Sequence, residues 1–298
     1  MKNTQQPLVS VITATYNMAN YVCEAIDSIL NQSYPAVQCV VVDDGSTDST
    51  PEVLKRYDDD SRVKVIRQTN AGQTVAKNHG LREADGELIG FCDADDRWRP
   101  DKLTIQVPLL LADSTTGVIY GNFQCIGPEG QNLETPVWKC PSGRITGSLL
   151  ADNVVHFPTV LTRREILHEF EGFDENLSMA IDYDLWLRIS TRYAFIHIPE
   201  VLVDYRIWGG QMSNRTGERL ENAFRMTGNF LERHPESVTA AQARRAWAHT
   251  YVTRGLWHLR EGRTREAISD FKRAFNNRPW DMRLWKTLVK WGLGRSPE

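Results

Sequence analysis

Three aspartates follow an apolar run closely enough to share one ligand. Residues 88–96 read LIGFCDADD, so the run ends in carboxylates at Asp93, Asp95 and Asp96. A short apolar run is typical of a buried strand, and an unpaired carboxylate is costly to bury, so the chain must reach the surface at Asp93. Carboxylates two residues apart in a turn suit a hard divalent cation that also carries phosphate oxygens. The alternative is an acidic turn that caps the helix predicted after Pro100.

The elements around these aspartates predict a sheet that brings other polar loops to the same place. Strands and helices alternate, with strands predicted over 8–14, 39–42, 63–66 and 87–92 and helices over 19–31, 46–57 and 73–84. This alternation with short loops is typical of an α/β fold with a doubly wound, mostly parallel sheet. The carboxyl ends of parallel strands share one edge, so we expect residues 13–17, 43–46, 70–72 and 93–96 to lie there together.

The loops at this edge indicate a nucleotide crevice. Turn chemistry favours Asp, Asn and Gly, and it accounts for any one of these loops alone. Four such loops on one edge, two of them beginning with acids, favour a nucleotide site. Neither G-x-G-x-x-G nor G-x-x-x-x-G-K-S/T follows the first strand, which argues against a dinucleotide site and against a P-loop.

The second half of the chain adds one more acid at the start of a helix. Apolar spacing predicts a core-facing helix over 181–189, and Asp182 lies at its N-terminal end, where the helix dipole favours an anion. On this local pattern alone, Asp182 is equally an N-cap residue. The other expected elements are helices over 101–111 and from 163, strands over 118–123, 157–162 and 201–206, and an exposed excursion over 127–142.

Composition excludes several classes of protein. A net charge of −3 and a pI near 6.2 argue against a general nucleic-acid binder. No apolar stretch reaches the roughly 18 residues of a membrane-spanning helix, and the polar residues 1–7 lack the apolar core of a secretory signal. The five cysteines are odd in number and widely spaced, so we expect reduced thiols in a cytosolic protein.

Four blocks of the sequence together resemble glycosyltransferase family 2, over about residues 7–215. The blocks are VSVITATYN at 9–17, VDDGSTD at 42–48, NAGQTVAKN at 70–78 and FCDADD at 91–96. The resemblance implies a GT-A fold, a nucleotide-sugar donor and a divalent metal, Mn²⁺ or Mg²⁺. It also implies that Asp95 ligates the metal. The residues it implies for nucleotide binding are Thr13, Ala14, Tyr16, Asp43, Gly72, Lys77 and Asp93.

A second family signature is present as GFDE at 172–175 followed by IDYDLWLR at 181–188. By this match Asp182 is the general base that deprotonates the acceptor hydroxyl, with Asp184 as the alternative. Ile181 stands where the family usually has Glu, so contacts with the acceptor are expected to differ.

The segment after the strand over 201–206 departs from the family pattern at one position. The residue pair YR at 205–206 matches, but Trp208 replaces the usual His, and QMS follows at 211–213. The match makes Arg206, Trp208 and Gln211 candidates for contacts with the diphosphate or the acceptor. Trp208 is either a stacking platform for a sugar or a hydrophobe at the rim.

The expected activity is metal-dependent, inverting transfer of a sugar from a nucleotide diphosphate, with uridine as the expected base, to a hydroxyl group. The acceptor would be a glycan or a lipid-linked molecule in the synthesis of a cell-surface polysaccharide or glycoconjugate. The alternative is a catalytically inactive protein that binds a nucleotide-sugar and acts as a scaffold. Asp93, Asp95 and Asp182 argue against it, whereas Ile181 and Trp208 favour it. A nucleotidyltransferase would need a Gly-rich phosphate loop that residues 13–17 lack.

The remaining chain predicts a helical C-terminal region, so we expect a catalytic domain over 1–215 and helices over 216–298. Residues at 251–279 are spaced as in one tetratricopeptide repeat, with Phe271 packed between two helices. One repeat cannot bury its face alone, so the helices are expected to dock, self-associate or bind a partner. Tryptophans and basic residues over 280–294 predict a docked helix with a solvated face or, alternatively, peripheral contact with the inner face of a membrane.

Overall fold

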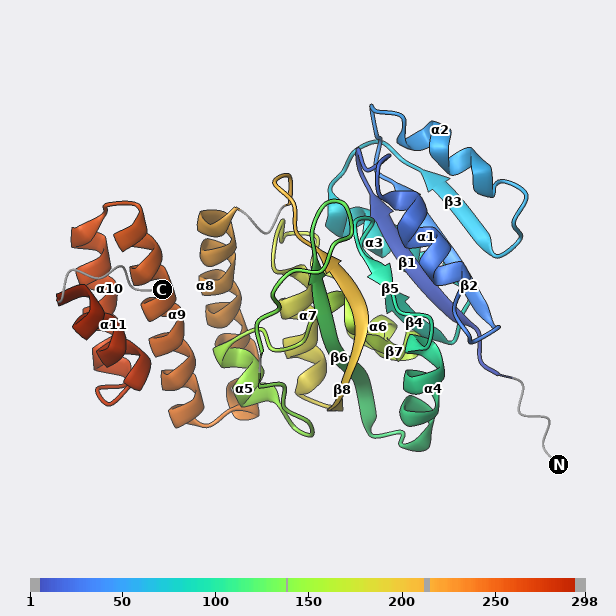
Figure 1. Ribbon diagram of the computed structural model, residues 1–298. Helices are drawn as coiled ribbons and strands as arrows, with labels where there is room; N and C mark the ends of the chain where they lie inside the picture. The colour runs from blue at the N-terminus through green and yellow to red at the C-terminus, as the bar shows by residue number, and fades with distance from the viewer. Residues whose placement is uncertain (1–5, 138, 212–214, 293–298) are drawn as a thin grey trace. The chain divides into compact units, whose positions relative to one another are not determined.

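The computed structural model describes residues 6–137, 139–211 and 215–292 of the chain (Figure 1). The chain forms two compact units. The first consists of residues 1–144 and 154–211, and the second of residues 145–153 and 212–298. The second unit therefore takes a short segment from the middle of the chain as well as the C-terminal region, a feature that nothing in the sequence indicates.

The first unit is built on one mixed sheet of eight strands, which confirms the predicted α/β class. Its order is β3-β2-β1-β4-β7-β6-β8-β5. The strands β3, β2, β1 and β4 are parallel, β7 is antiparallel to β4 and β6, β8 is parallel to β6, and β5 is antiparallel to β8. The strand bounds are β1 Val9–Thr15, β2 Val37–Asp43, β3 Val63–Arg67, β4 Leu88–Phe91, β5 Arg97–Trp98, β6 Thr116–Ile126, β7 Leu161–Arg163 and β8 Ala194–Arg206.

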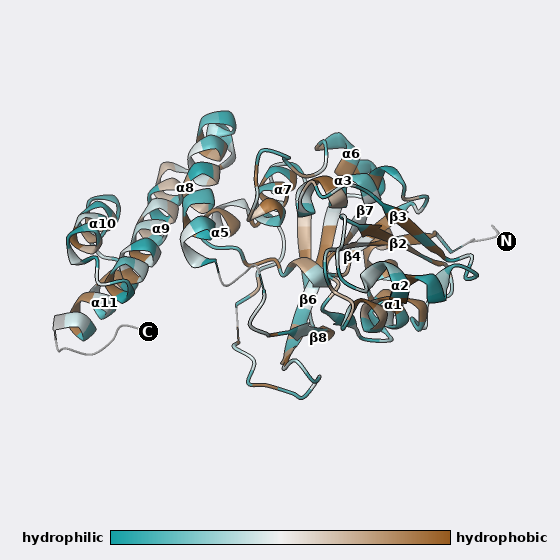
Figure 2. Ribbon diagram, turned by 90° about the horizontal axis from the view of Figure 1, so that it is seen from above, coloured by the Kyte–Doolittle hydropathy of each residue, from teal (hydrophilic) through white to brown (hydrophobic). Residues whose placement is uncertain are grey.

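The central strands are the most apolar part of the chain, and helices cover them. Figure 2 shows hydrophobic strands flanked by helices that are hydrophilic on their outer sides. Helix α1 is typical, because Val22, Ala25, Ile26 and Ile29 recur at helical spacing and are all buried. The helices of this unit are α1 Val22–Leu30, α2 Thr50–Leu54 with a 3-10 turn Lys55–Tyr57, α3 Gln73–Arg82, α4 Lys102–Ala112, α6 Arg164–Glu169 and α7 Ile181–Ser190.

One predicted strand differs from the structure, and two elements of the structure were not predicted. The strand predicted over 157–162 is wrong, because a 3-10 turn, Phe157–Thr159, precedes a strand of only three residues. Pro158 lacks the N–H that a strand interior needs, and the Thr159 hydroxyl donates to the carbonyl of His156 at 2.7 Å. The short strand β5 and helix α5, Thr146–Ala151, were not predicted.

The second unit is all-helical in the part that the structure describes. Its elements are α5, α8 Thr216–Arg233, a 3-10 turn Pro235–Ser237, α9 Ala240–Arg260, α10 Thr264–Asn277 and α11 Met282–Gly292. Thr239 and Gln242 form a capping box at the start of α9. A Cβ at Gly255 would lie 2.5 Å from the Phe271 ring, so the glycine allows α9 and α10 to approach around that ring, as predicted. Within residues 6–137, 139–211 and 215–292, no helix is both long enough and apolar enough to cross a bilayer.

Candidate active site

The sheet register brings the polar loops of the first unit to one edge. Thr15 at the end of β1 pairs with Asp43 at the end of β2, and Asp43 pairs with Arg67 at the end of β3. On the other side of β1, Ile12 pairs with Phe91, the last residue of β4. The loops after these four strands therefore open at the same edge, as expected for parallel strands.

Asp43 lies at this edge, and only one of its two carboxylate oxygens accepts a hydrogen bond. Its Oδ1 accepts from the backbone N–H of Ser46 at 2.9 Å, which shapes the loop after β2. Its Oδ2 is buried and has no hydrogen-bond partner among the residues described, although Arg67 Nε lies 3.5 Å away. A buried acceptor without a donor is costly, so this oxygen is suited to a donor from a ligand.

The predicted nucleotide-binding residues at the end of β1 differ in their exposure to solvent. The Tyr16 side chain is 45 % exposed, and Ala14 is half-buried, so both are accessible at the edge. Thr13, in contrast, is fully buried within β1. Asp43 is buried to a similar extent, so the burial of Thr13 does not test its predicted contact with a nucleotide, which stays a prediction.

Two side chains that the sequence analysis did not select hold these loops in place. Asn17, with a left-handed φ of 55°, accepts through Oδ1 from the backbone N–H groups of Thr47 and Asp48 at 2.8 and 3.2 Å. Asp44 accepts from the backbone N–H groups of Ala71 and Gly72 at 2.9 and 2.8 Å. Asp44 is thus a structural carboxylate beside Asp43. The only sequence signal for it is its adjacency to Asp43.

Gly72 and Lys77 lie at the start of α3. Gly72 has a φ of 93°, a region that side chains rarely adopt, and its own position is exposed. Lys77 is buried, its Nζ lies 3.0 Å from Asp93 Oδ1, and the ammonium is 4.2 Å from the centre of the Phe157 ring. The structure therefore brings the predicted Lys77 and Asp93 together, and it adds Phe157, which no motif indicated.

The acidic turn, residues 93–96, lies between β4 and β5. Trp98 packs so closely on Gly90 that an added Cβ would lie 2.5 Å from the indole ring. Asp95 is half-buried and accepts through Oδ2 from Trp208 Nε1 at 2.8 Å. Asp96 is buried and accepts through Oδ1 from the backbone N–H of Arg206 at 2.9 Å, while its Oδ2 has no hydrogen-bond partner within the described part of the chain.

The electrostatics of this turn favour an added cation. The pKa of Asp95 lies above its ordinary value because of burial and the nearby charge of Asp93, while the hydrogen bond from Trp208 lowers it. Burial, Asp95 and Asp93 also raise the pKa of Asp96 well above its ordinary value. A raised carboxyl pKa means that the protein stabilises the charged carboxylate less well than water does, and a bound cation would stabilise it.

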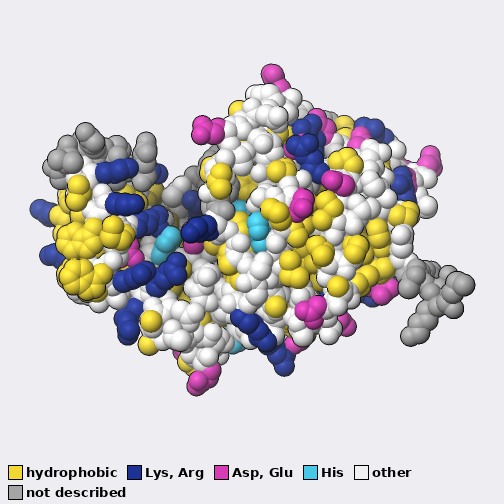
Figure 3. Space-filling model, turned by 60° about the horizontal axis from the view of Figure 1, so that its bottom comes forward, with side chains coloured by type: hydrophobic (Ala, Val, Ile, Leu, Met, Phe, Trp, Pro, Cys, Tyr) yellow, Lys and Arg dark blue, Asp and Glu magenta, His cyan; other side chains and the backbone are white. Residues whose placement is uncertain are grey.

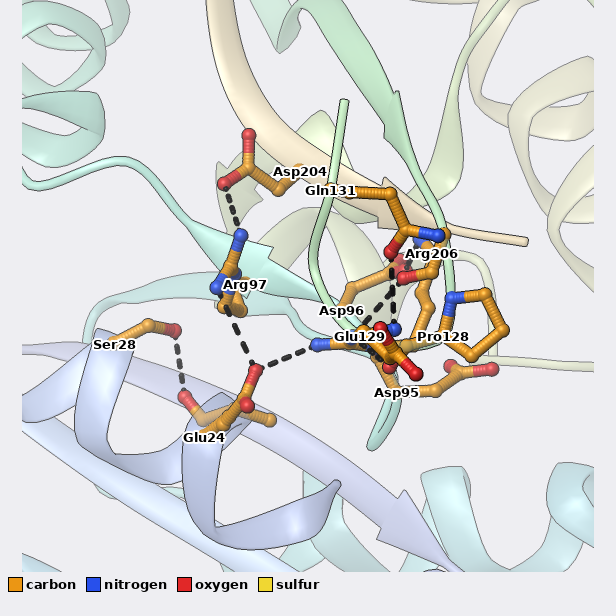
Figure 4. A network of polar contacts seen from close by, with 12 residues as sticks. Glu24, Ser28, Asp95, Asp96, Arg97, Pro128, Glu129, Gln131, Asp204 and Arg206 are labelled. Atoms are coloured by element: carbon orange, nitrogen blue, oxygen red, sulfur yellow. Dashed lines mark hydrogen bonds and ion pairs between the residues drawn. The ribbon is translucent and has the colours of Figure 1, made fainter. Parts of the chain in front are cut away.

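The buried side chain of Arg206 is bonded to the acidic turn and to neighbouring elements (Figure 4). Its guanidinium is buried and donates to the carbonyls of Asp95 and Pro128 at 2.8 Å each and to Glu24 Oε2 at 2.6 Å. The same group lies 4.6 Å from the centre of the Tyr21 ring. All three guanidinium nitrogens therefore donate to the protein, and a contact of Arg206 with the diphosphate stays a prediction. Glu24, on α1, was not predicted as its partner.

Trp208 and Gln211 pack beside this arginine. The Trp208 ring lies 5.5 Å from that of Tyr21, and Gln211 accepts from the Trp208 backbone N–H while donating to the Arg206 carbonyl. The position of the usual family histidine is thus taken by an indole that binds Asp95. Ser213, which the sequence analysis included in the same element, lies outside the described residues.

Asp182 lies in the first turn of α7, and the segment before that helix is tied to α3. Thr74 Oγ1 donates to the carbonyl of Leu177 at 2.8 Å, and Gln73 Nε2 donates to that of Ser178 at 3.1 Å. Helix α3 also carries Lys77, so one helix links the acidic turn to the start of α7. Asp184, the alternative base, is ion-paired with Arg188 at 2.8 Å. Asp184 is therefore already paired, and the assignment of Asp182 as the base stays a prediction.

The donor set fits a divalent metal held in part by a ligand. No cluster of three or more His, Cys, Asp or Glu side chains suited to a metal occurs in the described ranges. Asp95, with Asp93 nearby, offers hard carboxylate oxygens in a negatively charged turn. Mg²⁺ and Mn²⁺ sites of this kind take one or two carboxylates and complete their coordination with substrate phosphates and water.

Comparisons with known proteins identify the family and the fold of the chain. The family described as "Glycosyl transferase family 2" matches residues 10–170. An uncharacterized glycosyltransferase of Rickettsia typhi is 32 % identical over 240 residues, which cover 78 % of this chain and 74 % of that protein. A hyaluronan synthase of Pasteurella multocida is 30 % identical over 231 residues, 76 % of this chain but only 23 % of the synthase.

Two solved structures share the fold at low sequence identity. A mannosyltransferase of Pyrobaculum calidifontis in complex with GDP-Man and Mn²⁺ superposes with a TM-score of 0.64 at 22 % identity, over 97 % of this chain and 81 % of that chain. Residues 1–349 of TarS from S. aureus in complex with UDP-GlcNAc superpose with a TM-score of 0.60 at 19 % identity, over 97 % and 92 % of the two chains. The predicted GT-A fold is thereby confirmed. The chain belongs to glycosyl transferase family 2, and it is a glycosyltransferase.

Proposed function

We propose that the protein transfers a sugar from a uridine diphosphate sugar to a hydroxyl group, with inversion and with a divalent metal. The observation that carries this proposal is the buried Oδ2 of Asp43, which lacks a donor at the edge where Asp93 and Asp95 lie. A nucleobase that donates an N–H beside its carbonyl groups would supply that donor, and the diphosphate would extend toward the acidic turn. The ligands named for the two similar structures, UDP-GlcNAc and GDP-Man, both contain such a base.

In this proposal each side chain has a separate task. Asp182 accepts the proton of the acceptor hydroxyl as its oxygen bonds to the anomeric carbon, and the bond from that carbon to the diphosphate breaks. The anomeric centre inverts in a single displacement, so no carboxylate nucleophile is needed. Lys77 balances the charge of Asp93 beside the donor, and Tyr16 covers the base.

Asp95, with Asp93 nearby, would hold the metal. When bound, a divalent cation stabilises the charge that develops on the departing diphosphate. The turn is kept in place for this by the close packing of Trp98 on Gly90 and by Arg206.

We further propose that the product belongs to a cell-surface polysaccharide or glycoconjugate, with a glycan or a lipid-linked molecule as acceptor. Support comes from the similarity to a hyaluronan synthase. This chain spans less than a quarter of that synthase, so the similarity concerns one transferase segment.

A thermal-shift titration with UDP, GDP and their sugars, each with and without Mn²⁺, tests the proposal. We expect uridine nucleotides to raise the melting temperature, more so with Mn²⁺, since a ligand at 100 times its dissociation constant adds about 2.7 kcal/mol to stability. Asp43→Asn should reduce the shift in melting temperature both with and without Mn²⁺. Asp95→Ala should reduce only the additional shift that Mn²⁺ produces. Asp59→Asn, an exposed acid, is the matched control. If no nucleotide shifts the wild-type protein, the proposal is wrong.

One observation keeps a non-catalytic binding protein as the second candidate. Trp208 donates to Asp95 Oδ2, so an oxygen expected to face the metal already has a partner. Transfer to an acceptor, or slow donor hydrolysis that depends on Mn²⁺ and disappears in Asp182→Asn, would exclude this candidate. Binding without either reaction would establish it.

A further inference from the structure

Large apolar side chains are exposed along the last two helices of the second unit. Trp280 is 84 % exposed, Met282 68 % and Val289 58 %. Phe275 on α10 and Trp285 on α11 are also exposed, and their ring centres lie 6.2 Å apart, which joins the two helices into one surface. We call these five residues the apolar patch. Figure 3 shows a group of hydrophobic side chains on the surface of this unit with Lys and Arg around them.

The apolar patch is distinct from the core of this unit. The opposite side of α11 supplies that core, because Leu284 is fully buried in a cluster with Phe271 and Ala274. Leu288 and Trp291 pack against the same cluster. The docking expected for α11 from its sequence therefore uses one face of the helix, and a second apolar face is left at the surface.

The surroundings of the apolar patch are strongly basic. Residues 272–292 contain six Lys or Arg and one Asp. The whole segment 215–298 contains 17 Lys or Arg and 9 Asp or Glu. Residues 1–214, in contrast, contain 18 Lys or Arg and 29 Asp or Glu. The weakly negative net charge of the chain therefore conceals a basic C-terminal region beside an acidic remainder.

We propose that the apolar patch and its lysines bind the surface of an anionic lipid bilayer. Tryptophan and other large apolar side chains insert at the boundary between headgroups and acyl chains, and lysines reach the anionic headgroups from the same helix. Lys286 and Lys290 are exposed on α11 between and beside the apolar residues, as this mode requires. The inference rests on the second unit alone and does not depend on the identity of the sugar donor.

Co-sedimentation of the full-length protein with vesicles tests the proposal. We expect binding to vesicles of phosphatidylglycerol and phosphatidylcholine, little binding to phosphatidylcholine alone, and weaker binding as salt increases. Lys286→Gln/Lys290→Gln should lower the partition coefficient about 30-fold, since each lysine near an anionic surface contributes ~1 kcal/mol. Trp280→Ser/Met282→Ser should remove the binding that persists at high salt.

Controls come from exposed residues of the first unit. Leu111→Ser and Lys55→Gln/Arg82→Gln should sediment like the wild-type protein, and all variants should show its circular dichroism spectrum and melting temperature. Patch variants that sediment like the wild type would overturn the proposal, as would a wild-type protein that ignores anionic vesicles. So would a patch variant that only converts a dimer to a monomer in light scattering, because a second copy would then be the occupant.

Discussion

The acids of the first unit differ in the contacts that they already make, and we expect this difference to separate structural from functional residues. Asp44 accepts from two backbone N–H groups, and Asp184 is paired with Arg188. Asp43 keeps one buried oxygen that has no hydrogen bond and lies 3.5 Å from Arg67 Nε, and Asp95 keeps a raised pKa. A sequence motif gives all these residues the same letter, so their partners must be known before roles are assigned.

At the residue scale, Asp182→Asn should abolish transfer and leave nucleotide affinity nearly unchanged, because the amide cannot accept the acceptor proton. Asp184→Asn should retain activity within about tenfold and lower stability by ~1 kcal/mol, because it weakens the half-buried pair with Arg188. Steady-state transfer rates together with calorimetric titration of the nucleotide measure both. The reverse ranking of the two variants would make Asp184 the base.

Trp208→Phe should shift the pH dependence of metal binding. The hydrogen bond from Trp208 lowers the pKa of Asp95, so its loss raises that pKa further. Metal binding requires the deprotonated carboxylate, so affinity for Mn²⁺ in the presence of UDP should begin to fall at a higher pH in the variant as the solution is acidified. Titrations over a pH series measure the midpoint. Tyr21→Phe, which alters the ring beside Trp208 but not its bond to Asp95, should leave the midpoint in place.

At the element scale, Arg206 joins β8, the acidic turn, α1 and the 127–131 loop. Arg206→Lys should lower stability by ~3 kcal/mol, because an ammonium cannot replace a buried guanidinium that donates to two carbonyls and a carboxylate. Differential scanning calorimetry should show a lower melting temperature than in Arg82→Lys, an exposed control. An unchanged melting temperature with a raised KM for the donor would instead make Arg206 a diphosphate ligand.

The first four strands and the edge where their loops meet could be predicted because the sequence signals for them are local. The apolar runs at 8–14 and 39–42 are strands of the structure, and the polar loops after them meet at one edge. The prediction was wrong at 157–162, where a proline and a hydroxyl redirect the backbone within an apolar run. The buried partners of Arg206 come from positions as distant as Glu24, and no local pattern contains that information.

At the scale of the whole molecule, the second unit is made of two stretches of chain. Helix α5 lies between residues of the first unit in sequence, yet it belongs with the C-terminal helices. Its Leu149 and Leu150 are fully buried, and a Cβ on Gly147 would lie 2.1 Å from the Gln242 side chain of α9. The boundary suggested by the sequence, near residue 215, is therefore not a place where the chain divides cleanly.

A chain truncated after residue 211 should consequently be less soluble than the full-length protein, because α5 loses the helix that it packs against. We expect it to bind a hydrophobic dye and to melt over a broad range, since uncovered leucines favour association. Replacing residues 145–153 of the truncated chain with a Gly-Ser segment of equal length should restore a sharp transition and weaken dye binding. Dye fluorescence during a thermal ramp measures both. A truncated chain that melts as sharply as the replaced one would mean that α5 is stable without α9, and that the C-terminal helices are an independent addition.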